Sequence, residues 1–107
     1  MTELTGKQRR FLRAAAHAQK ALVQIGHAGL TAGVSKAIDQ ALETHELVKI
    51  RVLAEAGVDA DALVEPIEAA TRSSVVQVIG RTLLVYRRRK KDPKITLPAA
   101  GRTRGEP

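Results

Sequence analysis

The sequence contains no cysteine and almost no aromatic residues. The absence of cysteine excludes disulfide bonds, thiolate chemistry and zinc-ribbon sites. The only aromatic residues are Phe11 and Tyr86, and tryptophan is absent. Folds such as the RRM and the cold-shock barrel need several exposed rings on which bases stack, and this chain cannot supply them. We expect Phe11 to lie in the core and Tyr86 to pack at the end of a strand.

Long hydrophobic runs are missing as well. No apolar run approaches the roughly 18 residues of a membrane span, and the first residues lack the apolar core of a signal peptide. These absences predict a cytoplasmic protein with no membrane partner. The length of 107 residues and the hydrophobic content of 44% predict one folded domain with a modest core of small and aliphatic side chains.

The residue types that usually carry catalysis or bind metals form no recognisable constellation. His17, His27 and His45 are ten and eighteen residues apart, which is not a metal-ligand spacing. The serines lack the context of a nucleophile elbow, and the acidic residues of the range 55–68 have the pattern of a solvated helix face. We therefore expect a protein that is not an enzyme, with no metal, no cofactor and no small-molecule substrate.

Positive charge is in excess and is concentrated toward the C-terminal end. The formal net charge is +7; residues 87–107 hold eight Lys/Arg against two Asp/Glu, whereas residues 1–86 hold ten against nine. Within the body, residues 7–13 hold four bases and no acid, and residues 55–68 hold five acids and no base. A polyanion would be attracted to one side of this molecule and repelled by another. The basic run 88–91 is expected to be mobile charge.

Hydrophobic periodicity predicts a helix, a strand, a second helix and a second strand in the first half of the chain. The first helix, over residues 5–18, begins with a Thr5–Gln8 capping box. A short strand at 22–25 and a helix at 31–44 follow. Residues 47–53 then alternate, which predicts a strand with Lys49 and Arg51 on its polar face. Such a strand belongs to a sheet with one solvated face or to a sheet edge.

The second half predicts a helix and a hairpin. The helix runs from a cap at Asp59 or Asp61 to about residue 72, and Pro66 lies inside it. An interior proline costs about 3 kcal/mol, so this helix is either kinked or shorter than the pattern, and we expect a kink. Strands at 75–79 and 82–87 flank Gly80-Arg81, a turn typical of a type II′ hairpin. The order α-β-α-β-α-β-β predicts an α+β, two-layer fold with a mixed four-stranded sheet.

Two glycines, Gly26 and Gly29, enclose a tight loop between the first strand and the second helix. Glycine lets the backbone turn sharply and leaves no Cβ in the way of a ligand. The first free N–H groups of the following helix, and the positive end of its dipole, face the same space. A Gly-x-x-Gly loop clamps the nucleic-acid backbone in KH domains. Ordinary strand-to-helix turns have similar sequences, so the surroundings of the loop must decide.

Five blocks of the sequence occur in a familiar order. They are residues 4–8 (LTGKQ), 25–31 (IGHAGLT), 33–34 (GV), 41–50 (ALETHELVKI) and 76–87 (VQVIGRTLLVYR). Together they resemble the bacterial YhbY family of stand-alone CRM domains, named for chloroplast RNA splicing and ribosome maturation. The resemblance implies a CRM RNA-binding domain over residues 4–97, similar in fold to the C-terminal domain of translation initiation factor 3. It leaves residues 98–107 as a disordered basic tail.

The resemblance also implies a function. It implies binding to ribosomal RNA in precursors of the large subunit, and assistance to ribosome assembly; we expect a monomer. On this analogy the RNA-facing loop is Gly26, His27, Ala28 and Gly29, and the basic contacts beside it are Lys7, Arg10, Lys49, Arg81, Arg87 and Arg88. Because aromatic platforms are missing, recognition should depend on phosphates, 2′-hydroxyls and RNA shape. The alternative is a protein-interaction module that docks its basic tail on an acidic partner.

Overall fold

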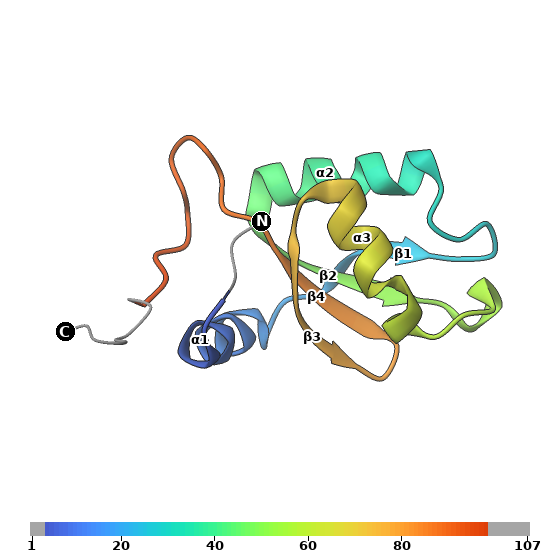
Figure 1. The fold of residues 1–107 in the computed structure, drawn as a ribbon, viewed down its shortest axis with the longest axis horizontal. Helices are drawn as coiled ribbons and strands as arrows, with labels where there is room; N and C mark the ends of the chain where they lie inside the picture. Colours follow the sequence, from blue (N-terminus) through green and yellow to red (C-terminus); the bar gives the residue numbers. More distant parts are fainter. Residues whose placement is uncertain (1–3, 99–107) are drawn as a thin grey trace.

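The computed structural model describes residues 4–98, which fold in the predicted order α-β-α-β-α-β-β (Figure 1). Its elements are α1 (Gly6–Ala16), β1 (Ala21–Ile25), α2 (Ala32–His45), β2 (Leu47–Val52), η1 (Ala54–Ala56), η2 (Ala60–Leu63), α3 (Val64–Thr71), β3 (Ser74–Ile79) and β4 (Thr82–Tyr86), where η marks a 3-10 helix. The predicted capping box of Thr5 and Gln8 starts α1. The expected tail lies outside the described residues apart from Pro98. Within the described residues, no helix is both long and apolar enough to cross a membrane.

The four strands form one mixed sheet in the order β1-β2-β4-β3. β1 and β2 are parallel, because α2 carries the chain back between them, and the β2–β4 and β3–β4 pairs are antiparallel. β2 and β4 therefore lie at the centre of the sheet, and β2 is not an edge strand. This sheet, with helices packed on it, confirms the predicted α+β fold.

Helices α2 and α3 cover one face of the sheet (Figure 1). The alternating residues Val48, Ile50 and Val52 of β2 point into this layer and are fully buried, as their pattern predicts. Ile38 and Leu42, one turn apart on α2, belong to the same core. Each such aliphatic side chain contributes about 1.5–3 kcal/mol on burial. This layer is the larger of the two hydrophobic cores.

The opposite face is covered only in part, by α1 and by residues 95–97. Leu12 and Ala16, one turn apart on α1, form a second core with Leu47, Leu84 and Tyr86 of the sheet. Beyond α1 this face is open to solvent, so the expected solvated face is limited to the part of the sheet that α1 leaves uncovered.

The predicted positions of the two aromatic residues are confirmed for one and wrong for the other. Tyr86 is buried at the end of β4, as predicted. Phe11 is 41% exposed, so its predicted place in the core is wrong. The reason is that Leu12 and Ala16 set the contact line of α1, and Phe11 lies about 100° around the helix from Leu12.

Pro66 does not kink a long helix. The predicted third helix is divided into the 3-10 helix η2 and the α-helix α3, which begins at Val64. Pro66 therefore lies in the first turn of α3, where a backbone N–H has no intrahelical acceptor to lose. The expected kink is wrong, and the other alternative, a shorter helix, is what the chain adopts.

Left-handed backbone occurs at the predicted hairpin and at the end of α3. Gly80 has a φ of +57° while Arg81 does not have a positive φ, which matches a type II′ turn. Arg72 ends α3 with a φ of +53°, the conformation that glycine adopts most easily at this position. A non-glycine residue pays about 1–2 kcal/mol for it.

Residues 88–98, the C-terminal strap, fold back along the body and are held by Glu46. The carboxylate of Glu46 is fully buried and accepts hydrogen bonds from the backbone amides of Arg89 (2.8 Å), Lys94 (2.6 Å) and Ile95 (2.6 Å). The strap also packs Ile95 and Leu97 on the second core. The expectation that residues 88–91 are mobile charge is wrong at Arg89, which is anchored.

Candidate nucleic-acid interface

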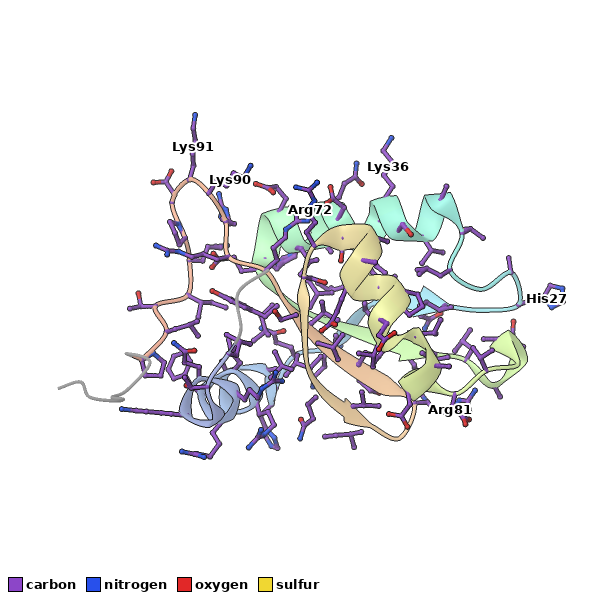
Figure 2. All side chains as sticks on the ribbon, in the orientation of Figure 1. His27, Lys36, Arg72, Arg81, Lys90 and Lys91 are labelled. Atoms are coloured by element: carbon purple, nitrogen blue, oxygen red, sulfur yellow. The ribbon has the colours of Figure 1, made fainter. Side chains whose placement is uncertain are left out.

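The loop from Gly26 to Gly29 lies at one end of the molecule, and His27 projects from its tip (Figure 2). The amide of Gly29 donates to the carbonyl of Gly26 at 2.9 Å and closes the turn. Gly29 has a φ of +74°, and a Cβ built there would meet nothing within 4 Å. Its glycine is therefore required by backbone conformation, and the space beside it is open for a ligand.

Helix α2 begins directly after this loop. Thr31 is its N-cap, and the Thr31 hydroxyl accepts from the amide of Val34 at 3.1 Å. The amides of Ala32 and Gly33, in the first turn, have no intrahelical acceptor. These donors and the positive end of the helix dipole can meet an anionic oxygen beside the loop.

An acidic residue stands next to the loop. A Cβ built on Gly26 would lie 3.6 Å from a carboxylate oxygen of Glu55, in η1. This charge opposes a phosphate at the same place, since the backbone donors of the loop would have to outweigh it. Sequence periodicity did not place Glu55 here, because η1 and the loop are brought together only by the pairing of β1 with β2.

Arg81 lies in the β3–β4 turn, at the same end of the molecule as His27 (Figure 2). Its guanidinium donates to the carbonyls of Val52 at 3.0 Å and Leu53 at 3.0 Å. A longer contact of 3.5 Å reaches the carbonyl of Val58. The side chain therefore anchors the chain around η1, and its remaining donor capacity faces solvent.

Arg87 lies at the other end of the sheet, and its side chain is engaged in contacts within the protein. Its guanidinium contacts the carboxylates of Asp39 at 2.6 Å and Glu43 at 3.3 Å, both on α2. It also donates to the carbonyl of Thr71 at 2.8 Å. Arg87 thus connects β4 to α2 and α3, and the structure gives it a structural role. Arg88, the next residue, is exposed.

The bases of α1 lie on two sides of the helix. Lys7 and Arg10 are exposed, as expected for the solvated face. Arg9 turns toward the sheet and donates to the carbonyls of Val75 and Val76 at 3.1 and 3.2 Å. The predicted basic contacts are therefore not one cluster, because α1, the Arg81 turn and the Arg87 region occupy different parts of the molecule.

A groove of about 270 Å³ separates α1 from the uncovered part of the sheet. Two of its lining residues, Ala16 and Leu84, are nearly buried and form its floor. The other residues that line it are Arg13, His17, Lys49, Gln77, Ile79 and Thr82. Lys49 donates to the carbonyl of Gln19 at 2.9 Å and keeps two further donors. Among the predicted contacts only Lys49 lines this groove. Arg13 and His17 were missed, although the recurrence of Arg9 and Arg13 on one helix face was a usable signal.

The strand register connects this groove to the glycine loop. One cross-strand row consists of Lys49, Leu84 and Gln77, and the next consists of Gln24, Arg51, Thr82 and Ile79. Arg51 shares its face with Lys49, because alternate residues of a strand point the same way. The second row ends on β1 at Gln24, two residues before Gly26. A solvent-open, basic path therefore leads from α1 across the sheet to the loop, and it contains Arg51, which is not among the predicted contacts.

Tyr86 cannot act as a stacking platform, since only 5% of its surface is exposed. Burial raises the pKa of its phenol, and the nearby Glu46 carboxylate raises it further, while Arg88 acts in the opposite direction. The hydroxyl has no hydrogen-bond partner in the described part of the chain. Tyr86 is thus a structural residue of the second core.

Comparison with known proteins gives a consistent assignment. The CRS1 / YhbY (CRM) domain model matches residues 4–87. "Probable RNA-binding protein YqeI" of Bacillus subtilis is 40% identical over 95 residues, covering 89% of this chain and 99% of that protein. An "RNA-binding protein" of Haemophilus influenzae is 40% identical over 101 residues, covering 92% of this chain and 98% of that protein.

A solved structure agrees with the fold. The solution structure of protein SAV1595 from Staphylococcus aureus matches with a TM-score of 0.76 and 44% sequence identity, covering 90% of this chain and all of that one. The family model covers most of the chain, and the relatives are similar over nearly their full length. The solved structure has the same fold as the chain. The chain belongs to the CRS1/YhbY (CRM) domain family.

Proposed function

We propose that this protein binds RNA along the path from α1 across the open part of the sheet to the Gly26–Gly29 loop. The observation that carries the proposal is the register that aligns Lys49 and Arg51 between the Arg13 side of α1 and the glycine loop. Phosphates near α1 and over the sheet would contact basic side chains, and phosphates at the loop would contact backbone amides. The names of the relatives, which describe RNA-binding proteins, support the same partner.

We further propose that the RNA is ribosomal, in precursors of the large subunit, and that binding assists ribosome assembly in the cytoplasm without catalysis. The resemblance to stand-alone CRM domains supports this assignment. The protein would act as a monomer. The arrangement suits recognition of RNA shape, because phosphates and 2′-hydroxyls are the groups that backbone amides, Lys and Arg bind best.

The direct test is Arg51→Ala, measured by fluorescence anisotropy with a labelled fragment of large-subunit ribosomal RNA. Arg51 is exposed on the open face, so its loss should leave the fold intact. We expect weaker binding and a salt slope smaller by about 0.7–0.9, the value for one phosphate contact. Lys36→Ala is the matched control, because Lys36 projects from α2 on the other face of the sheet (Figure 2). Equal losses in both variants would contradict the proposed path.

Nuclease treatment distinguishes RNA binding from the alternative, which is binding to an acidic protein partner. Under the RNA proposal, co-sedimentation with ribosomal particles disappears after RNA digestion. A complex that survives digestion and depends on Lys90 and Lys91, which project from the strap (Figure 2), would favour a protein partner.

A further inference from the structure

We propose that the groove between α1 and the sheet takes the base of one unpaired nucleotide of the bound RNA. This inference rests on the proposed RNA binding and adds a subsite to it. The scarcity of aromatic residues predicted little recognition of bases, and this subsite would add recognition of one base. The groove lies on the path described above, at its α1 end.

The size and floor of the groove suit a single base. Its volume of about 270 Å³ is just below the roughly 300–1,000 Å³ of pockets that enclose whole small ligands. Ile79, on the edge strand β3, is 63% exposed at its rim. Leu84 and Ala16 are nearly buried and close the bottom of the groove, so Ile79 supplies most of the accessible apolar surface, and a base placed there would remove Ile79 from water.

The polar groups of the groove are free to bind a base edge. The carboxamide of Gln77 and the hydroxyl of Thr82 form no side-chain hydrogen bond within residues 4–98, and both line the groove. A carboxamide presents a donor and an acceptor side by side, which matches the donor–acceptor pattern of a base edge. An unpaired base exposes its Watson–Crick edge, whereas in an A-form helix this edge is occupied by base pairing.

The charge around the groove suits the rest of the nucleotide. Arg13, His17 and Lys49 line it and no acidic residue does. Lys49 has donors left for a phosphate after its bond to Gln19. The Arg13 guanidinium supplies a plane on which a base can stack, a role that arginine shares with aromatic rings in RNA complexes. The carboxylates of an acidic peptide could pair with these charges, but they supply no apolar ring to cover the exposed side chain of Ile79.

The test compares five RNA hairpins that differ only at one bulged position in an otherwise paired stem. Four carry one of the four bases there and the fifth carries an abasic residue, so their phosphates are equal in number. We expect the wild-type protein to bind the best of the four bulged bases roughly tenfold more tightly than the abasic hairpin, the effect of a few matched contacts. Ile79→Ala and Gln77→Ala should each reduce this preference and leave the affinity for the abasic hairpin unchanged.

The controls separate this inference from the proposed function. Lys36→Ala, on the other face of the sheet, should retain the full preference. Equal binding of the base-containing and abasic hairpins by the wild-type protein would overturn the base subsite while leaving RNA binding in place. Failure to bind any of the hairpins or the ribosomal RNA fragment at low salt would overturn both. Two variants are used because Ile79 is largely exposed, so its truncation should not perturb folding even if Gln77→Ala does.

Discussion

Because the space beside Gly29 is open, one charged substitution at this position can test whether the glycine loop contacts RNA. Gly29→Asp places a carboxylate beside the free amides of α2, and its expected effect is a loss of about 1–2 kcal/mol in RNA binding from repulsion alone. Gly29→Asn is the matched control, because it carries the same left-handed strain at a φ of +74° without the charge. Anisotropy titrations should show a much smaller loss for Asn. Equal losses would mean that the loop matters through its shape and does not contact phosphate.

Glu55 should produce the opposite effect. Its carboxylate lies near Gly26, so Glu55→Gln removes a charge that repels phosphate. We expect affinity for RNA to rise by about 0.5–1 kcal/mol at low salt, with a gain that shrinks as salt screens the interaction. Glu65→Gln, on the exposed side of α3, should leave affinity unchanged. A decrease for Glu55→Gln would show that this carboxylate positions the loop.

The buried phenol of Tyr86 should make the stability of the fold decrease at alkaline pH. Burial and Glu46 raise the pKa of its phenol above the usual 10.0. A neutral buried phenol stabilises the fold fully below pH 10, and this contribution is lost as the pH rises through the raised pKa. Because Tyr86 is the only tyrosine and tryptophan is absent, its ionisation can be followed directly by ultraviolet absorbance.

The variant Tyr86→Phe supplies the control for this transition. It removes a hydroxyl without a partner in the described residues, so stability near neutral pH should be unchanged or higher by up to about 1 kcal/mol. The decrease in unfolding free energy above pH 10 should be smaller than in the wild type. A phenol that ionises at pH 10 or below would show that Tyr86 is solvated.

At the scale of the elements, the C-terminal strap depends on one buried carboxylate. Glu46→Ala leaves three amides without an acceptor, each costing about 1–3 kcal/mol. We expect a loss of at least about 3 kcal/mol of stability, and the amides of Arg89, Lys94 and Ile95 should lose hydrogen-exchange protection.

Glu46→Gln is the finer variant for the strap. Its single carbonyl oxygen can still accept from Lys94 and Ile95, which share one oxygen of Glu46. Only the amide of Arg89, which uses the other oxygen, should then lose protection. Unchanged exchange in both variants would mean that the strap is held by the packing of Ile95 and Leu97 and by the hydrogen bond from the Gln8 carboxamide to the carbonyl of Pro98. Truncation after Arg87 is therefore a poor test of tail charge, because it also removes these contacts.

At the scale of the whole molecule, the RNA proposal predicts discrimination between nucleic acids. A ribosomal RNA fragment, its DNA version and a shape-matched RNA of scrambled sequence should be compared in competition at fixed salt. The DNA should compete poorly, because 2′-hydroxyls exist only in RNA. The scrambled RNA should compete well if it keeps an unpaired base that fits the groove. DNA that competes as well as RNA would reduce the binding to nonspecific attraction by the basic surface.

The sequence by itself determined the local structure and the family of this protein. The capping box at Thr5, the alternation of Val48, Ile50 and Val52 and the Gly80-Arg81 turn are each encoded within a few residues, so periodicity and turn chemistry were sufficient. The same applies to the left-handed Gly29 of the loop.

Only the tertiary structure decided how charged residues are used. Arg87 and Asp39 are 48 residues apart, as are Glu46 and Lys94, and no local pattern predicts which distant partner a charge will meet. Folding therefore turned Arg87 inward and anchored the strap. Local alternation had already placed Lys49 and Arg51 on one face of β2. The strand order β1-β2-β4-β3 then put Gln77 in the row of Lys49, and Gln24 and Thr82 in the row of Arg51, because cross-strand register joins side chains that the sequence keeps far apart.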